Sequence, residues 1–143
     1  MFEYIVLASA LLLAVAAALV MKWRNGRFAS VSAPDDRPRL DLALLNEAPG
    51  ERASLVQFSS AFCAPCRTTR VVLKQVAELV PGVVAVEVDA ESHLELVREF
   101  QIMRTPTVLI LDSDGVIVSR ASGAPTKEQV LETLVKNLPN LNK

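Results

Sequence analysis

Residues 58–67 of the chain read FSSAFCAPCR, and this stretch contains both of its cysteines, Cys63 and Cys66. Residues 54–60, SLVQFSS, follow a Pro-Gly turn at residues 49–50 and predict a strand that ends here. Apolar residues at helical spacing follow the cysteines as far as about residue 80, where a Pro-Gly pair ends the pattern. The cysteines therefore lie between the end of a predicted strand and the start of a predicted helix.

A cysteine in the first turn of a helix faces unpaired backbone N–H groups and the positive end of the helix dipole. Both stabilise a thiolate, and Arg67 and Arg70 add positive charge to the same helix. The spacing of the cysteines brings the second sulfur within bonding distance of the first in one turn. Two cysteines this close predict redox chemistry or half of a metal site, and not the disulfide framework of a small secreted protein.

The pattern past residue 39 predicts a compact α/β domain. Residues 39–45 are ambiguous and allow a short edge strand. Ser92 with Glu95, and Thr126 with Gln129, have the spacing of capping boxes. The expected strands are 54–60, 83–88, 107–111 and 116–119, and the expected helices run from the cysteines to about 80, from 92 to 100 and from 126 to 138. This order predicts a central mixed sheet with helices on both faces.

The motif resembles that of the thioredoxin family, an aromatic residue followed by Cys-Gly-Pro-Cys. Residues 62–66, Phe-Cys-Ala-Pro-Cys, match it with two mild changes. Thr105-Pro106-Thr107, just before an apolar strand, resembles the family's proline with a cis peptide bond that faces the cysteines. Ser122-Gly123-Ala124 resembles its glycine near the substrate groove. The resemblance covers about residues 40–143 and implies a thioredoxin-like fold.

The resemblance also implies a reaction and its residues. Cys63 would attack a substrate disulfide, and Cys66 would then resolve the mixed disulfide. Partners would be protein disulfides and an upstream thiol reductant, with neither cofactor nor metal. The substrate groove would be formed by Phe62, Ala64, Pro65, Thr105, Pro106 and Gly123. Phe62 could equally cap the core.

The sequence departs from the family at two positions. The family usually has a buried Asp six residues before the first cysteine, which helps to deprotonate the second, and here that position is Gln57. An amide cannot act as a base at neutral pH. The family's helix proline, five residues after the second cysteine, is replaced by Val71, so a straighter helix is expected.

The N-terminal segment predicts a membrane anchor. Residues 4–21 are apolar except for Ser9, and as a helix they would span about 27 Å, close to the thickness of a bilayer core. A signal peptide would begin with basic residues, whereas the basic residues here, Lys22, Arg24 and Arg27, all follow the run. We therefore expect an uncleaved anchor with its basic flank over residues 1–24, a flexible linker over 25–38 and the domain over 39–143. Because positive flanks stay in the cytoplasm, the domain is expected on the cytoplasmic face.

The sequence is also compatible with other functions. The domain could face the opposite side and serve envelope or cytochrome thiol chemistry, or it could be a binding module with weak redox activity. A zinc site would need a second chain, because His93 is the only further soft or borderline ligand. The net charge of −1, with no basic stripe, argues against nucleic acid as a partner.

Overall fold

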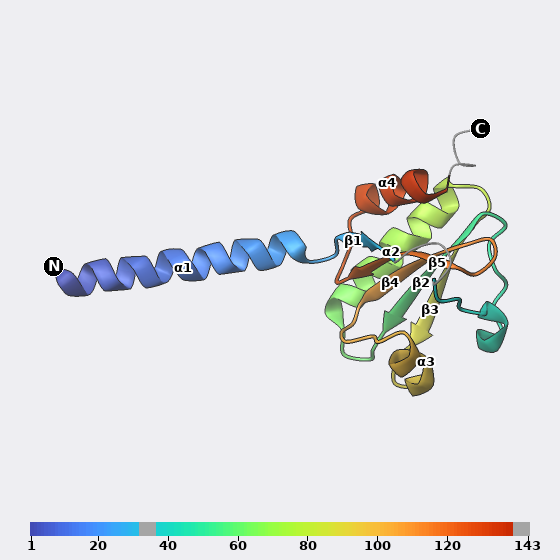
Figure 1. Ribbon diagram of the computed structural model, residues 1–143, viewed down its shortest axis with the longest axis horizontal. Coiled ribbons are helices and arrows are strands. Elements are labelled where there is room, and N and C mark those ends of the chain that lie inside the picture. Colours follow the sequence, from blue (N-terminus) through green and yellow to red (C-terminus); the bar gives the residue numbers. More distant parts are fainter. Residues whose placement is uncertain (32–36, 139–143) are drawn as a thin grey trace.

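The computed structural model describes residues 1–31 and 37–138. Its five-stranded sheet has the order β1-β5-β4-β2-β3, in which β2 and β3 run parallel and the other neighbours antiparallel. The strands are β1 (Phe28–Ser30), β2 (Ala53–Ser59), β3 (Val83–Asp89), β4 (Thr107–Asp112) and β5 (Ile117–Ser122). The helices are α1 (Phe2–Arg24), the 3₁₀ helix η2 (Leu42–Leu45), α2 (Ala64–Leu79), α3 (Leu94–Glu99) and α4 (Lys127–Asn137) (Figure 1).

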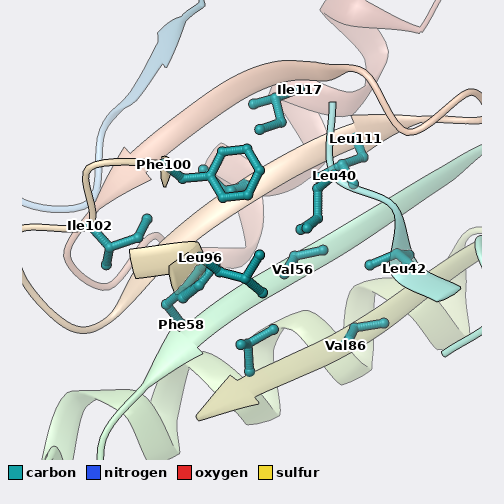
Figure 2. Close-up of a cluster of buried hydrophobic side chains, with 12 residues drawn as sticks. Leu40, Leu42, Val56, Phe58, Val86, Leu96, Phe100, Ile102, Leu111 and Ile117 are labelled. Atoms are coloured by element: carbon teal, nitrogen blue, oxygen red, sulfur yellow. The ribbon is translucent and has the colours of Figure 1, made fainter. Parts of the chain in front are cut away.

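Helices cover both faces of the sheet, which confirms the thioredoxin-like α/β architecture. On one face, Leu73 of α2 and Leu134 of α4 belong to one buried apolar cluster with residues of four strands. On the other face, Leu96 of α3 and Leu42 of η2 cover the sheet and belong to one cluster with Phe58 of β2 (Figure 2). Burial of these two apolar layers is the main favourable contribution to folding.

Strand β2 lies between β3 and β4, and all seven of its residues are buried. A strand covered on both faces is expected to be almost wholly apolar. Its polar exceptions, Ser54, Gln57 and Ser59, each have a hydrogen-bond partner. Gln57 and Ser59 lie close to the cysteines in sequence, whereas Ser54 lies at the opposite end of the strand and accepts from the Gly50 N–H.

Two segments differ in detail from the sequence prediction. The last strand runs three residues further than expected, to Ser122. The ambiguous residues 39–45 contain one isolated bridge, between Arg39 and Val116, and then the 3₁₀ helix η2. The Asp41 carboxylate accepts a hydrogen bond from the Ala43 N–H at 2.9 Å, which starts η2 instead of a longer strand.

The first predicted capping box is wrong. Helix α3 begins at Leu94, and its N-cap is His93, whose side chain makes no capping bond. The Ser92 hydroxyl donates instead to the Asp89 carboxylate at 2.6 Å, and the Glu91 N–H donates to the same side chain. This Asx turn occupies Ser92 before the helix starts.

The second predicted capping box, at the start of α4, is confirmed. The Thr126 hydroxyl accepts from the Gln129 N–H, and the Gln129 side chain accepts from the Thr126 N–H. Both bonds satisfy donors that the helix leaves unpaired at its first turn.

The boundary of the folded domain also differs from the prediction. Residues 28–30, inside the predicted flexible linker 25–38, form β1 and pair with β5. Phe28 packs against the core cluster beneath α4, which explains a strand in a stretch with few large apolar residues. Residues 32–36 of the predicted linker, and residues 139–143 at the end of the predicted domain, lie outside the described residues.

Helix α1 has 23 residues, none of them buried, and projects away from the domain (Figure 1). Its most apolar 18-residue stretch has a mean hydropathy of 2.6, and by length and composition the helix could cross a membrane. A helix that is apolar on all sides has no face suited to water, which fits a lipid environment.

Candidate active site at the start of helix α2

The two cysteines occupy the loop and first turn that follow β2. Cys63 is the N-cap of α2, and Cys66 lies in the first turn, where its N–H donates to the Cys63 carbonyl at 3.2 Å. The two form a disulfide with their Cα atoms 5.3 Å apart. Pro65 is accommodated at the start of the helix because its missing N–H would have no partner there.

The two sulfur-bearing residues differ in exposure. Cys63 is partly exposed, whereas Cys66 is only 1% exposed and lies behind it. An incoming disulfide can therefore approach Cys63 but not Cys66. Once reduced, Cys63 is also placed at the positive end of the helix dipole, which stabilises its thiolate.

Gln57 is buried beneath the first turn of α2. Its side-chain amide donates to the Cys66 carbonyl at 2.9 Å, so it ties β2 to the cysteine-bearing turn. The amide thus has a positioning role, and it still offers no group that could accept the Cys66 proton.

A polar cluster beside Gln57 was not identified from the sequence. Glu87 lies directly opposite Gln57 across β2 and β3. Its carboxylate accepts from the Ser59 hydroxyl at 2.7 Å and from two guanidinium nitrogens of Arg70. Hydrogen bonding by Arg70 lowers the pKa of Glu87, against the opposing effect of burial. Glu87 is therefore held as a carboxylate, and its partners Ser59 and Arg70 line the pocket that contains both cysteines.

A cavity of about 200 Å³ lies beside the disulfide. It has room for several water molecules, each of which occupies roughly 30 Å³. Water in this cavity could carry a proton away from Cys66, because the lining has many polar groups. The lining residues are Ser59, Ser60, Ala61, Cys63, Cys66, Arg67, Arg70 and Asp89.

The three segments of the predicted groove lie together. The Thr105–Pro106 peptide bond is cis, and the Thr105 hydroxyl lies 3.0 Å from the Ser60 hydroxyl in the cysteine loop. The Gly123 N–H donates to the Pro106 carbonyl at 2.7 Å. Phe62 is fully exposed, so it does not cap the core. Ala64 and Pro65 are exposed on the same loop and helix start.

The described residues contain no group of three or more His, Cys, Asp or Glu side chains that could hold a metal ion. His93 is a half-buried N-cap residue, and its Nδ1 lies 3.1 Å from the Asp89 carbonyl oxygen. The two cysteines are bonded to each other.

Comparisons with known proteins place these features in a family. The chain matches the thioredoxin family model over residues 43–136. A thioredoxin of Mycobacterium bovis is 37% identical over 62% of this chain and 76% of that protein. A bifunctional thioredoxin reductase/thioredoxin of Mycobacterium leprae is 36% identical over 62% of this chain and 19% of that protein.

A solved structure of a thioredoxin-2, a component of malaria parasite protein secretion machinery, has a TM-score of 0.54 at 15% identity. The match covers 59% of the present chain and 82% of the thioredoxin-2 chain. At 15% identity, this likeness supports the fold alone. The family match extends over most of the chain and includes the strand, the cysteine pair and the helix on which the chemistry depends. The chain belongs to the thioredoxin family and is a thiol–disulfide oxidoreductase.

Proposed function

We propose that the chain is a membrane-anchored reductant of protein disulfides, with Cys63 as nucleophile and Cys66 as resolving cysteine. The observation that carries this proposal is the contrast between a partly exposed Cys63 at a helix N-terminus and a buried Cys66 in the same turn. Only Cys63 is accessible to a protein substrate. Only Cys66 is placed to attack Cys63 and release that substrate.

Reduction of a substrate then takes two exchanges. The Cys63 thiolate attacks one sulfur of the substrate disulfide, forms a mixed disulfide and releases the other sulfur as a thiolate. The Cys66 thiolate attacks Cys63, which releases the second substrate thiolate and closes the Cys63–Cys66 disulfide. Two electrons have passed to the substrate, and an upstream thiol reductant must return them.

The groove gives the substrate its orientation. The backbone of Thr105 is the proposed pairing site for an extended substrate segment, in the manner of strand addition. Pro106 and Gly123 shape the groove behind it, and the exposed Phe62, Ala64 and Pro65 form its other side.

The proposed location is the cytoplasmic face of a membrane. Support comes from the apolar length of α1 and from Lys22, Arg24 and Arg27, which follow it. A membrane-impermeant thiol reagent applied to intact cells should leave the reduced Cys63 unlabelled. Ready labelling across a sealed membrane would instead favour an extracytoplasmic exchange protein of the envelope or of cytochrome maturation.

A redox titration of the full chain in detergent micelles tests the activity. A reversible two-electron couple, together with reduction of a soluble protein disulfide, is the expected result. A pair that cannot be cycled, in a chain that remains folded, would favour a binding module that has kept only the fold.

A further inference from the structure

Helix α1 joins the domain at the end of the sheet that carries the cysteines. Strand β1 begins with Phe28 opposite Ala121 of β5, and the neighbouring β5 residue Ser122 lies opposite Thr107 of β4. Thr107 in turn lies opposite Phe58, near the end of β2. In Figure 1, α1 leaves the domain on the side where α2 begins. The anchor and the active site therefore share one end of the domain.

The junction between α1 and β1 is fixed to the domain. It consists of Asn25, Gly26 and Arg27 alone. The Gly26 N–H donates to the Ser122 carbonyl at 2.9 Å, and Arg104 donates to the Asn25 side-chain oxygen at 2.7 Å. Gly26 is buried with a φ of +73°, and a Cβ there would lie 2.2 Å from the Ala124 carbonyl oxygen. These contacts oppose free rotation of the domain about its anchor.

The same junction touches the groove. A Cβ on Gly123 would lie 1.9 Å from the Asn25 side-chain oxygen, so Asn25 fills the space above this glycine. The Gly123 N–H donates a hydrogen bond to the Pro106 carbonyl, and Arg104 immediately precedes Thr105 and Pro106 in the sequence. Asn25 of the junction is thus part of the wall of the groove.

The length of the junction sets the distance of the active site from the membrane. Three extended residues span at most about 10 Å. The far end of the domain is further away, because α2 starts at the cysteines and its 16 residues rise about 24 Å from there. The exposed Met103 lies at the anchor end and Leu79 at the far end. An anchor at this end of the domain would turn the active site toward the membrane surface.

We infer that the substrate is a disulfide in a membrane-inserted protein, held within a few residues of the headgroup region. The inference rests on the proposed anchoring of α1. A substrate tethered in the same bilayer, with its disulfide at the height of the groove, meets Cys63 at a high effective concentration. A disulfide far above the surface gains less, because the groove is directed toward the membrane.

The kinetic test uses the full chain in lipid vesicles with two model substrates. Each has one membrane-spanning helix and the same disulfide loop, separated by about five residues or by about 60 flexible residues, the latter with a root-mean-square length of about 43 Å. Initial rates of reduction by the wild-type chain should be at least about tenfold higher for the short spacer. A soluble disulfide substrate supplies the reference rate.

The matched variant carries about 20 Gly and Ser residues inserted between Arg24 and Asn25, which leaves the contacts of Asn25 in place. This insertion should abolish the preference for the short spacer and leave the rate on the soluble substrate unchanged. Equal wild-type rates on the two tethered substrates would overturn the inference while leaving the oxidoreductase and its anchor intact. Release of the chain from vesicles by alkaline carbonate would overturn both the anchor and the inference.

A spectroscopic measurement tests the orientation without turnover. In a Trp23→Phe background, which removes the only tryptophan, Met103→Trp and Leu79→Trp report on the two ends of the domain. Lipids with a spin label at the headgroup should quench the tryptophan fluorescence of the Met103→Trp protein more strongly than that of the Leu79→Trp protein. The insertion after Arg24 should remove that difference. Equal quenching in the uninserted chain would overturn the inference.

Discussion

The two ends of the central sheet are held together by different kinds of contact. At the end distant from the cysteines, which we call the turn end, backbone groups and adjacent residues close the loops. The Arg52 N–H donates to the Gly82 carbonyl at 2.9 Å. The Asp112 carboxylate accepts from the N–H groups of Asp114 and Val116 within its own hairpin.

At the other end, which we call the redox end, side chains join segments that are far apart in sequence. The Ser60 and Thr105 hydroxyls form a hydrogen bond between residues 45 positions apart in the sequence. Ser59 and Glu87, which are 28 positions apart, form another. Asn25 meets Arg104 across 79 positions. Loss of one such side chain releases a segment, whereas the turn end depends mainly on backbone bonds that most substitutions preserve. Function should therefore respond to single substitutions at the redox end, and stability should respond at both.

The largest effect is expected for the cysteines themselves. Cys63→Ser should abolish disulfide reduction, because the attacking thiolate is gone. Cys66→Ser should still attack but not resolve, so mixed disulfides with substrate should accumulate and turnover should stop. Non-reducing gel electrophoresis after mixing with substrate measures both. Trapped complexes that form through Cys66 in the Cys63→Ser protein would show that the roles are reversed.

The next effect concerns the proton on Cys66. Removing a proton from a buried thiol is unfavourable, because desolvation disfavours the thiolate, and Gln57 cannot accept it. We expect slow resolution in the wild type and faster resolution in Gln57→Asp at neutral pH. An unpaired buried carboxylate should also lower the free energy of unfolding, by more than the cost of about 1–3 kcal/mol for a neutral unsatisfied group.

Gln57→Leu is the matched control for that prediction. It removes the hydrogen bond to the Cys66 carbonyl without adding an acid. Stopped-flow measurement separates attack by Cys63 from resolution by Cys66 in all three proteins. If Gln57→Asp folds and resolves no faster than the wild type, water in the cavity beside Cys66 already serves as the base.

Sequence predicted the parts of this site that depend on local pattern. The strand, the helix start and the cysteine pair follow from residues within one short stretch, and the groove segments follow from their resemblance to a family. The contact between Ser59 and Glu87 depends on the register of β2 against β3, which neither strand specifies alone. Its only signal was a charged residue that interrupts a run of valines in β3.

The anchor junction was missed for a related reason. Asn25 and Gly26 have the composition of a linker, and their sequence gives no indication of Arg104 or Ser122 as partners. Strand β1 contains one large apolar residue, Phe28, and no alternation that would predict pairing. Its structure comes from the exposed edge of β5, which offers unpaired backbone groups to any nearby segment.

A pair of glycines allows the two ends to be compared by the same substitution. Gly82 at the turn end has φ +82°, and Gly123 at the redox end has φ +105°. Alanine at either position should lower the free energy of unfolding by about 1–2 kcal/mol, because a side chain disfavours positive φ. Only Gly123→Ala should also reduce the rate on a substrate, since its Cβ would displace Asn25 beside the groove.

Urea unfolding measures the stability of the Gly82→Ala and Gly123→Ala proteins. Initial rates on the soluble and short-spacer substrates measure their activity. Gly82→Ala meets only the flexible side chain of Arg52, so its catalytic rate should match that of the wild type. Equal loss of activity in both variants, at equal stability, would mean that the contact of Asn25 with the groove has no consequence for turnover.

The smallest expected effect is the pH dependence contributed by Glu87. Hydrogen bonding from Arg70 lowers its pKa below the usual value of 4.5. A lowered folded-state pKa means that the stabilisation is fully present above the unfolded-state value and is lost as the pH falls through the folded-state value. The side chains of Arg70 and Glu87 are 54% and 32% exposed, so solvent screening limits the contribution to about 0.5–1 kcal/mol.

Glu87→Gln should therefore lower the free energy of unfolding of the oxidised chain at pH 7, and the difference from wild type should shrink as the pH falls below about 4.5. Asp89, whose pKa is lowered by its bond from Ser92, titrates in both proteins, and in the wild type its charge raises the pKa of Glu87 against the larger effect of Arg70. Glu95→Gln, on the exposed first turn of α3, is the matched control for loss of one surface charge. A difference that stays constant from pH 7 to pH 3 would mean that the ionisation of Glu87 contributes nothing to the free energy of unfolding. Its charge would then be free to change during turnover without loosening the strand beside Cys66.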